Sequence, residues 1–370
     1  MTEPIKVGLI GCGAICGIYL ENGRIFEDIE IVACADLQIE RAQAKAEEYG
    51  IPKACSGEEL LADPSIAVVL NLTTPIAHYP IALAALEAGK SVYNEKPLAI
   101  TRDEGAQLLA LAKQSNLRIG CAPDTFLGAG IQTCRKLIDD GWIGEPIAAN
   151  AFLGRREQDS KAITPEHHYK VGGGPMFNMG PYYLTALVSL IGPIARVSGM
   201  ARKTFPERLV NSHSGSGTRI TVDIPTHIIG TLEFVNGALG TITTSFDLWK
   251  STSPPIEIHG TEGSLSVTNP NLFGGSPKFL KGGTKEWQPV SLTHGYAENS
   301  RGIGLADMAC AMRKGRDHRA SGELAYHVLD VMHAIHEAAQ AGTRVDMQST
   351  CLRPAPMPTG LPAGSVDGGS

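Results

Sequence analysis

Short apolar runs alternate with helical patterns along the first third of the chain. Runs that resemble buried strands stand at residues 5–10, 29–35, 67–72, 91–93 and 118–121. Patterns with apolar residues at helical spacing, such as 39–49 and 102–114, lie between them. Buried runs joined by helical crossovers predict an α/β domain built on a parallel sheet. We place this domain at residues 1–124.

After residue 125 the pattern changes to alternating strands joined by turns. The predicted strands are residues 148–153, 197–203, 219–224, 227–234, 240–246, 256–259 and 264–267. Asn236-Gly237, between two of them, is a strong hairpin signal. This order predicts a second α/β domain at residues 125–350, with an open, mainly antiparallel sheet covered by helices on one face. The bare face predicts a homodimer or homotetramer joined sheet against sheet.

Helical patterns and a terminal tail complete the second domain. Residues 131–140 and 321–341 have apolar side chains at helical spacing, and the second of these is expected to pack back near the first domain. Residues 351–370 are rich in Pro, Gly and Ser, which predicts an extended or disordered, flexible tail.

Composition narrows the class of protein. With 32 basic and 38 acidic residues the net charge is −6, which argues against a nucleic-acid partner. No apolar run is long enough to span a membrane, and no basic leader precedes the first strand. The eight cysteines form no Cys-x-x-Cys pair, which favours a reducing, cytoplasmic setting. The histidines show no His-x-x-x-His spacing, so no metal is predicted.

A glycine-rich turn follows the first predicted strand. Gly11 allows the tight turn, and Gly13 lets a phosphate approach the backbone. The helix expected to begin near Ala14 and Ile15 offers free N–H groups to a pyrophosphate. Asp36 ends the second run at the distance where a carboxylate accepts the ribose hydroxyls of a dinucleotide, and it would repel a 2′-phosphate. The cofactor is therefore predicted to be NAD rather than NADP, although Asp36 could instead cap the next helix.

The turn after the third run holds further candidates for cofactor contacts. Pro75 suits the first position of a helix, which leaves Thr74 as a hydroxyl-bearing cap near the nicotinamide half. Thr73 and His78 belong to the same set. His78 is equally compatible with a core or capping role, and we assign it no catalytic function.

The fourth run ends in Glu95-Lys96-Pro97. The carboxyl edge of a parallel sheet is where open α/β folds bind their ligands. Because Pro97 restricts the backbone of Lys96, the lysine is predicted to project into the cleft. We expect Glu95 and Lys96 at the cofactor and Lys96 also at the substrate.

A second glycine-rich segment occupies residues 171–185. On a continuous helix Asn178, Tyr182 and Thr185 would share one polar stripe, whereas Tyr183 would face the core. Pro181 removes one helical hydrogen bond and is expected to kink this element.

Together these segments resemble the Gfo/Idh/MocA family over residues 5–345. The most specific similarities are NEKPLA at residues 94–99 and GGGPMFNMGPYYL at residues 172–184. The resemblance implies a Rossmann domain with NAD(P), an open-sheet second domain, and oxidation or reduction of a sugar or cyclitol hydroxyl. The family's lysine falls on Lys96. Its Asp-x-Gly-x-His-x-x-Asp motif falls on Asn178, Gly180, Tyr182 and Thr185, so three of the four positions differ.

These assignments lead to a mechanistic hypothesis. Tyr182 exchanges the hydroxyl proton while hydride moves between the substrate and NAD. An unassisted phenol is a poor base at neutral pH, so Lys96 is required beside it to favour phenolate. Asn178 would orient the phenol or a sugar hydroxyl. Further substrate contacts are expected from Asp124, His168 and Tyr169, although Asp124 could instead cap a turn.

Two other functions are compatible with the same residues. Transient oxidation of a sugar carbon would acidify the neighbouring C–H and allow elimination, as in NAD-dependent glycosidases or lyases. Alternatively, the neutral Asn178 and Thr185 would fit an NAD(H)-responsive binding protein without catalysis.

Overall fold

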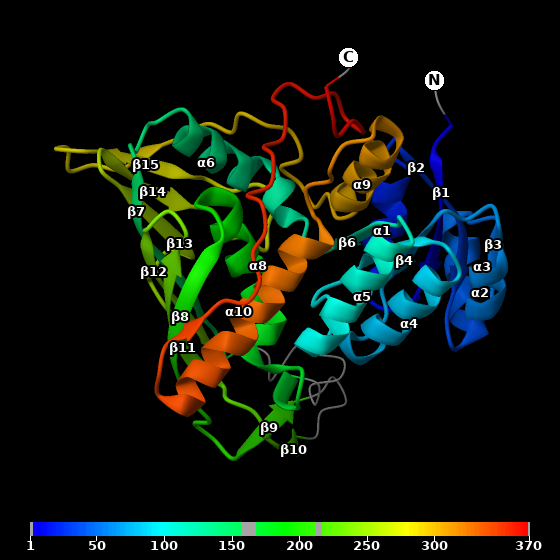
Figure 1. The fold of residues 1–370 in the computed structure, drawn as a ribbon, viewed down its shortest axis with the longest axis horizontal. Helices are drawn as coiled ribbons and strands as arrows, with labels where there is room; N and C mark the ends of the chain where they lie inside the picture. Colours follow the sequence, from blue (N-terminus) through cyan, green and yellow to red (C-terminus); the bar gives the residue numbers. More distant parts are fainter. Residues whose placement is uncertain (1–2, 157–167, 212–216, 369–370) are drawn as a thin grey trace.

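The computed structural model describes residues 3–156, 168–211 and 217–368. Figure 1 shows two domains side by side: a sheet surrounded by helices, and a broad curved sheet with helices on one face. The predicted fold, a Rossmann-type domain followed by an α/β domain with an open and mainly antiparallel sheet, is confirmed.

The first sheet is entirely parallel, with strand order β3-β2-β1-β4-β5-β6. Its strands are β1 (Ile5–Ile10), β2 (Ile29–Ala35), β3 (Lys53–Cys55), β4 (Val68–Asn71), β5 (Ser91–Asn94) and β6 (Ile119–Cys121). The strand order reverses between β1 and β4, and such a switch point opens a ligand crevice at the carboxyl ends of the strands. The sequence pattern did not predict β3, because three residues are too few to show a period.

Five helices connect these strands. They are α1 (Cys16–Gly23), α2 (Ile39–Tyr49), α3 (Gly57–Ala62), α4 (Pro75–Glu87) and α5 (Arg102–Gln114). Two of them begin with a capping box: Ser56 with Glu59 on α3, and Thr101 with Glu104 on α5. In each box the hydroxyl accepts from the backbone N–H of the glutamate, whose carboxylate accepts from the N–H of the cap residue.

The second domain is built on a sheet of order β16-β15-β14-β13-β7-β12-β11-β8-β17. Its strands are β7 (Pro146–Gly154), β8 (Ile194–Arg202), β11 (His227–Phe234), β12 (Leu239–Ser245), β13 (Ile256–Gly260), β14 (Gly263–Val267), β15 (Lys278–Lys281), β16 (Gln288–Pro289) and β17 (Val345–Asp346). Neighbouring strands are antiparallel except for β7 and β12, which run parallel. The predicted strand at residues 219–224 was wrongly assigned to this sheet. It overlaps β10 (Gly217–Thr221), which forms a separate hairpin with β9 (Glu207–Asn211).

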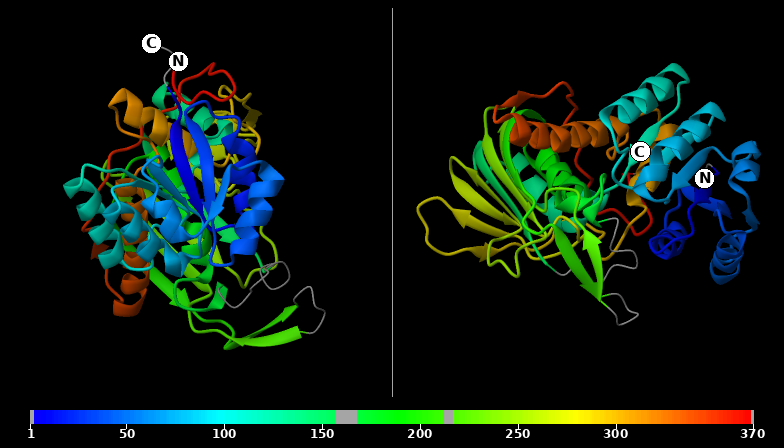
Figure 2. Two further views of the ribbon diagram at one scale, coloured as in Figure 1. Left: turned by 90° about the vertical axis from the view of Figure 1, so that its right-hand side faces the viewer. Right: turned by 90° about the horizontal axis from the view of Figure 1, so that it is seen from below.

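Helices cover one face of this sheet (Figure 2). They include α6 (Ala129–Asp139), α8 (Gly174–Leu190) and α10 (Gly322–Ala341), and a 3₁₀ turn, η1 (Thr125–Leu127), precedes α6. The close approach of α10 to β8 depends on Gly199, because a Cβ there would lie 2.5 Å from the carbonyl oxygen of Ile335. As predicted, α10 also reaches the first domain, where Asp330 binds Arg102 of α5 at 2.5 Å.

Besides the short strands β15, β16 and β17, two larger features of the C-terminal third were not predicted. One is α9 (Ile303–Lys314), which packs beside β6. The other is the packing of residues 351–368. This segment has no helix or strand, as expected, but Met357 and Val366 are buried in the core and Asp367 binds Arg316 at 3.0 Å. A segment anchored in this way differs from the flexible tail that its composition predicted.

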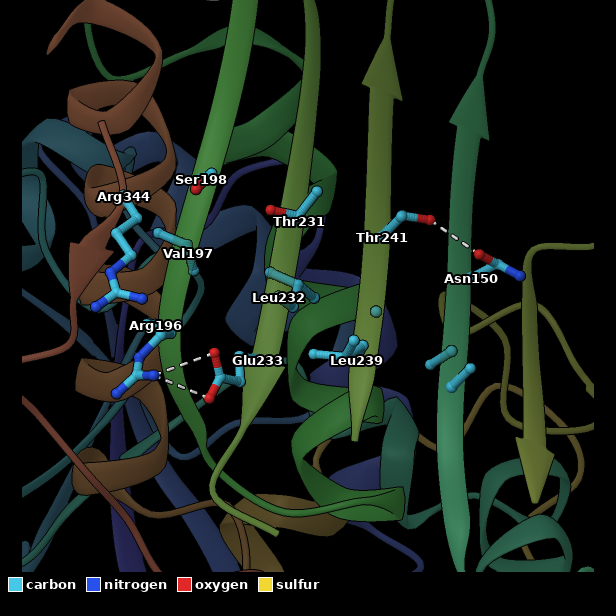
Figure 3. Close-up of a pocket in the computed structure, with 13 residues that line it drawn as sticks. Asn150, Arg196, Val197, Ser198, Thr231, Leu232, Glu233, Leu239, Thr241 and Arg344 are labelled. Atoms are coloured by element: carbon cyan, nitrogen blue, oxygen red, sulfur yellow. Dashed lines mark hydrogen bonds and ion pairs between the residues drawn. The ribbon is translucent and has the colours of Figure 1, made fainter. Parts of the chain in front are cut away.

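The opposite face of the second sheet carries no helix of the described chain, and a shallow hollow of about 470 Å³ lies along it (Figure 3). Side chains on β11 alternate, with Ile228 and Leu232 buried while Ile229 and Thr231 point to this open face. Glu233 accepts two hydrogen bonds from Arg196 on β8, at 3.1 and 3.3 Å.

Candidate active site

The glycine-rich turn has the conformation that a phosphate-binding loop needs. Gly11 has a φ of +105°, and a Cβ there would lie 2.7 Å from the backbone of Leu72. Gly13 is exposed, with no described atom within 4 Å of where its Cβ would be. The helix α1 begins after Ile15, two residues later than Ala14, and no side chain of the described chain caps it. The N–H of Cys16 donates to the carbonyl oxygen of Gly13 at 3.2 Å. The other N–H groups of the first turn have no carbonyl of a preceding turn to bind, so they are available to an anion.

Asp36 lies beside this turn, at the end of β2. One carboxylate oxygen accepts from the backbone N–H of Cys12 at 2.8 Å, and the other accepts from the N–H of Gln38 at 3.0 Å. The alternative role as a cap of α2 is wrong, because Gln38 holds the N-cap position. The neighbouring Leu37 is fully exposed, so an apolar surface adjoins the carboxylate. Leu37 is absent from the residues predicted for the cofactor site, although the sequence places an apolar residue directly after the acid.

The turn after β4 is organised by buried polar groups. Pro75 begins α4 and Thr74 is its N-cap residue, without a side-chain cap bond. The Thr73 hydroxyl donates to Asn71 at 2.6 Å. His78 is buried, and its two ring nitrogens lie 2.6 Å from the carbonyl oxygen of Pro97 and 3.1 Å from that of Thr73.

His78 therefore supports the cleft and offers it no surface, which corrects its assignment as a cofactor contact. Burial lowers the pKa of its imidazole, so the ring is neutral at pH 7. It joins the loop after β4 to the loop after β5.

The loop after β5 places Glu95 and Lys96 at the carboxyl edge of the first sheet. The Glu95 carboxylate accepts from the Tyr19 hydroxyl at 2.8 Å and from the backbone N–H of Lys96 at 3.0 Å. Glu95 thus ties α1 to this loop. Its carboxylate is occupied by protein groups and holds the backbone from which the Lys96 side chain departs.

Lys96 reaches across to the second domain. Its ammonium group donates to the backbone carbonyl of Asn178 at 3.0 Å and lies 5.5 Å from the centroid of the Tyr182 ring. Pro181 lies within α8 and has no N–H to donate to the turn before it. The structure therefore brings the predicted ammonium and phenol groups together.

His168 also joins this cluster. The side-chain amide of Asn178 donates to Nδ1 of His168 at 2.8 Å. Thr185 and Tyr183, further along α8, are both buried. For Tyr183 this confirms the predicted core position, and burial raises the pKa of its phenol to about 12.

Two predicted substrate contacts lie elsewhere. Tyr169 has no exposed surface and packs edge-on against Phe246. Asp124 is buried, and its carboxylate accepts from the backbone N–H groups of Gly302 at 2.8 Å and Gly304 at 3.1 Å. The capping alternative for Asp124 is therefore the one the structure shows, at the N-terminus of α9. Burial raises the pKa of this carboxyl group and the two hydrogen bonds lower it. The effect of burial is larger, so the pKa is raised to about 6.

Sequence reasoning missed Arg301, which lies in the loop before α9. Its guanidinium donates to the side-chain oxygens of Asn299 at 2.8 Å and Asn271 at 2.9 Å. Burial acts against its charge, but Tyr182 and Asp124 contribute to a raised pKa. No motif marks this arginine, because its position beside Tyr182 arises only from the tertiary fold.

Among the described residues, no group of three His, Cys, Asp or Glu side chains is arranged to hold a metal ion. No helix in the described part of the chain is long and apolar enough to cross a membrane.

Two family models match most of the chain. Residues 5–122 match the oxidoreductase family with an NAD-binding Rossmann fold, and residues 131–266 match the GFO/IDH/MocA C-terminal domain. The border between the two matches falls in the region where the sheet type changes.

Individual relatives agree with these matches. A 1,5-anhydro-D-fructose reductase of Ensifer adhaerens is 30% identical over 268 residues, which cover 71% of this chain and 75% of that protein. A D-glucoside 3-dehydrogenase of Escherichia coli is 22% identical, over 94% and 98% of the two chains. The solved structure of a levoglucosan dehydrogenase with NADH and L-sorbose has a TM-score of 0.81 at 23% identity and covers 93% of this chain and 99% of that one. The chain therefore belongs to the GFO/IDH/MocA family of oxidoreductases, with an NAD-binding Rossmann domain at its N-terminus.

Proposed function

We propose that this protein is an NAD-dependent oxidoreductase acting on a hydroxyl or keto carbon of a sugar, a cyclitol or a sugar derivative. The observation that carries the proposal is the position of Lys96, which extends from the cofactor edge to within 5.5 Å of the Tyr182 ring centroid. Relatives named as an anhydrofructose reductase and a glucoside dehydrogenase support a carbohydrate substrate.

The residues of the first domain fit a dinucleotide. Gly13 leaves its backbone open, and α1 begins with uncapped N–H groups, so a pyrophosphate would find donors there. Asp36 favours NAD, because its carboxylate would accept ribose hydroxyls and repel a 2′-phosphate. The exposed Leu37 would gain a partner for its apolar surface if the adenine lay against it. When bound, NAD supplies the group that accepts or returns the hydride.

The remaining chemistry belongs to side chains of this protein. Tyr182 accepts the hydroxyl proton during oxidation and returns it during reduction. The positive charge of Lys96 lies beside the phenol ring and stabilises the negative charge that develops on the substrate oxygen. Asn178 cannot act as a base. Its amide donates to His168, and together these two side chains form a polar wall for sugar hydroxyls.

Replacing the two proposed catalytic groups tests this scheme. We expect Tyr182→Phe and Lys96→Met each to lower kcat by about 10²- to 10⁴-fold, the range for loss of general acid–base catalysis. NADH binding, followed by its fluorescence, should be retained. Turnover is measured by NADH absorbance over a panel of sugars, cyclitols and their keto forms. Tyr183→Phe is the matched control, because it removes the same hydroxyl from the neighbouring residue, whereas Lys96 approaches the ring of Tyr182.

Wild-type turnover in both Tyr182→Phe and Lys96→Met would contradict the proposal. The same assay separates the two alternatives. Cleavage of a glycosidic bond without net NADH would identify the oxidation–elimination route. NADH binding without turnover of any sugar on the panel would identify a binding protein.

We also propose that the chain forms a homodimer or homotetramer through the open face of its second sheet. Exposed apolar side chains on this face, including Leu239 and Ile229, support the proposal. Leu239→Asp combined with Ile229→Asp should lower the mass measured by light scattering by at least half, since two charges would be buried between the sheets. Leu209→Asp, on the separate β9–β10 hairpin, is the control. An unchanged mass in the double variant, or a monomeric wild type, would contradict this assembly.

A further inference from the structure

A second pocket, of about 220 Å³, lies where the first domain meets two helices of the second. Its walls include Ile100 just before α5, Phe177 of α8 and His333 of α10. Figure 1 shows these three helices close together, and α10 packs against both of the others. Neither Lys96 nor Tyr182 is among the described residues that line this pocket. It is therefore separate from the candidate active site, and we call it the interdomain pocket.

Two glycines bring the backbone directly against the apolar walls of this pocket. Gly172 and Gly174 have φ values of +84° and +86°, which residues with a side chain rarely adopt. A Cβ on Gly172 would lie 2.9 Å from Cδ1 of Ile100, and one on Gly174 would lie 2.6 Å from Cδ1 of Ile224. Both isoleucines line the pocket. Val171 lines it too and is exposed, so a ligand can enter there from solvent.

Three rings from two helices form another wall. The Phe177 ring lies nearly parallel to that of His336, with centroids 5.7 Å apart and 21° between the planes. It meets the His333 ring edge-on, at 5.0 Å and 72°. A further aromatic ring could join this group by the same kinds of contact. Since an apolar cavity of about 150 Å³ holds benzene, the interdomain pocket has room for a ring system of about six to ten non-hydrogen atoms.

The two histidines supply the polar groups of the pocket. Nε2 of His333 lies 2.9 Å from the carbonyl oxygen of Ile100, and because a carbonyl only accepts, Nε2 carries the hydrogen. Burial lowers the pKa of both imidazoles, that of His336 to about 4, so both are neutral at pH 7. In the described chain His336 has no hydrogen-bond partner. A neutral imidazole has one donor and one acceptor, and those of His336 remain for a ligand.

The lining excludes several classes of ligand. No Lys, Arg, Asp or Glu belongs to the described lining, so a charged molecule would lose its hydration without gaining a counter-ion. The Thr101 hydroxyl, also in the lining, already accepts from the N–H of Glu104 at 3.2 Å. A sugar would therefore leave most of its hydroxyls without partners. A flat apolar molecule with a single polar group fits the walls and the histidines together.

We propose that the interdomain pocket binds a small neutral aromatic molecule with one hydroxyl or N–H donor. Its ring packs against Phe177 and Ile100, and its donor binds a ring nitrogen of His336. Such a molecule touches both domains, and Phe177 directly precedes Asn178, whose carbonyl accepts from Lys96. Binding therefore stabilises the arrangement of the domains in which this contact forms. It does not depend on which reaction the protein catalyses.

Indole is the probe, because it is a neutral ring system with a single N–H. Calorimetric titration of the full chain should show saturable binding of one indole per chain, with a Kd of about 0.1 to 1 mM. Indole at ten times its Kd should raise Tm by about 1 to 3 °C. The absence of saturable binding up to about 10 mM would overturn the inference, and an unchanged Tm at saturation would overturn the proposed stabilisation.

Variants of the pocket locate the binding. Ile224→Phe places a ring in the pocket and should abolish indole binding, whereas Leu352→Phe adds the same ring at an exposed site outside the pocket and should leave it unchanged. Phe177→Ala should weaken binding by at least about tenfold, and it decides the question if circular dichroism shows Ile224→Phe to be unfolded. Wild-type affinity in the folded pocket variants would overturn the inference. So would loss of indole binding in saturating NADH, which would place the probe in the dinucleotide crevice.

The role of His336 is tested with a matched pair of ligands. The wild type should bind indole about three to ten times more tightly than 1-methylindole, which lacks the N–H. In His336→Leu this preference should disappear, while binding of 1-methylindole is retained. A preference that persists in His336→Leu, or none in the wild type, would overturn the assignment of the donor to this imidazole.

Discussion

The two sides of the candidate active site are built in different ways. On the cofactor side, Gly13 and Asp36 stand on successive loops of one parallel sheet, and Asp36 is held by backbone groups of Cys12 and Gln38. On the other side, Tyr182 stands on α8 and its partners come from distant parts of the chain. Lys96 arrives from the loop after β5, and the loop before α9 brings the charge of Arg301 near enough for Tyr182 to contribute to the raised pKa of that arginine.

This difference predicts how substitutions should behave. Substitution of a group that is held by adjacent loops of one sheet can change the affinity for one ligand and leave the rest of the protein unaffected. A group held through long-range contacts should alter stability and activity together, because the same bonds position several segments. The next three predictions test this contrast, and the third has the smallest expected effect on stability.

The first prediction concerns the C-terminal segment, which is held by contacts with distant parts of the chain, such as that between Asp367 and Arg316. Met357 is buried, whereas Leu352 in the same segment is exposed. Met357→Ala should lower the free energy of unfolding by about 3 kcal/mol, as expected for a truncated core side chain. Leu352→Ala should change it by less than about 0.5 kcal/mol. Urea denaturation measures both, and equal effects of the two variants would contradict the packing of this segment.

Asp124 should make stability depend on pH. Burial raises its pKa in the folded protein to about 6 from an ordinary value of 3.8, so the folded state binds the proton more tightly. Its stabilising contribution is complete below about pH 4 and is lost as pH rises through 6. The loss is of the order of 3 kcal/mol.

Asp124→Asn removes the charge and keeps an oxygen that can accept from Gly302 or Gly304. The free energy of unfolding, measured by thermal or urea denaturation between pH 4 and 7, should therefore fall less steeply with pH in this variant than in the wild type. Identical pH dependence of the two proteins would contradict the buried, ionisable state of this carboxylate.

Asp36 should show the smallest effect on the protein itself. Asp36→Ser should weaken NAD binding by about tenfold and raise the NADP-to-NAD preference, since a repelling charge near the 2′-position is lost. The free energy of unfolding should change by less than about 1 kcal/mol, because the residue is partly exposed. Fluorescence titration with NADH and NADPH measures the first effect, with the exposed Asp317→Ser as control. An unchanged preference would remove Asp36 from the cofactor site.

Much of the first domain could be predicted because its functional groups follow strands in sequence order. The strands β1 and β2 begin and end at the predicted residues, and so does β11 of the second domain. The strands β3, β9, β15, β16 and β17 were missed. Two or three residues carry no period, and the equally short β6 was predicted only because an apolar run follows the helical pattern at residues 102–114. The helix α9 was missed although its residues are largely apolar, because Gly302 offers no side-chain cap to mark its start.

The site was predicted only in part, for a related reason. Lys96 and Tyr182 stand on segments whose patterns mark them, and the fold brings them together. Asp124 and Tyr169 are polar residues near those segments, but their burial is decided by α9 and by Phe246, which local patterns do not describe. Arg301 has no local pattern at all, and only its tertiary neighbours reveal it.

The buried ring of His78 has a consequence for motion at the cleft. A neutral imidazole carries a hydrogen on only one of its two ring nitrogens, yet carbonyl oxygens face both nitrogens, at 2.6 and 3.1 Å. At any moment the ring can donate to only one of the two loops that it touches. Exchange of tautomers would move the hydrogen bond from the segment that carries Lys96 to the segment that carries Thr73. The location of one hydrogen atom therefore decides which wall of the nucleotide crevice is held more firmly.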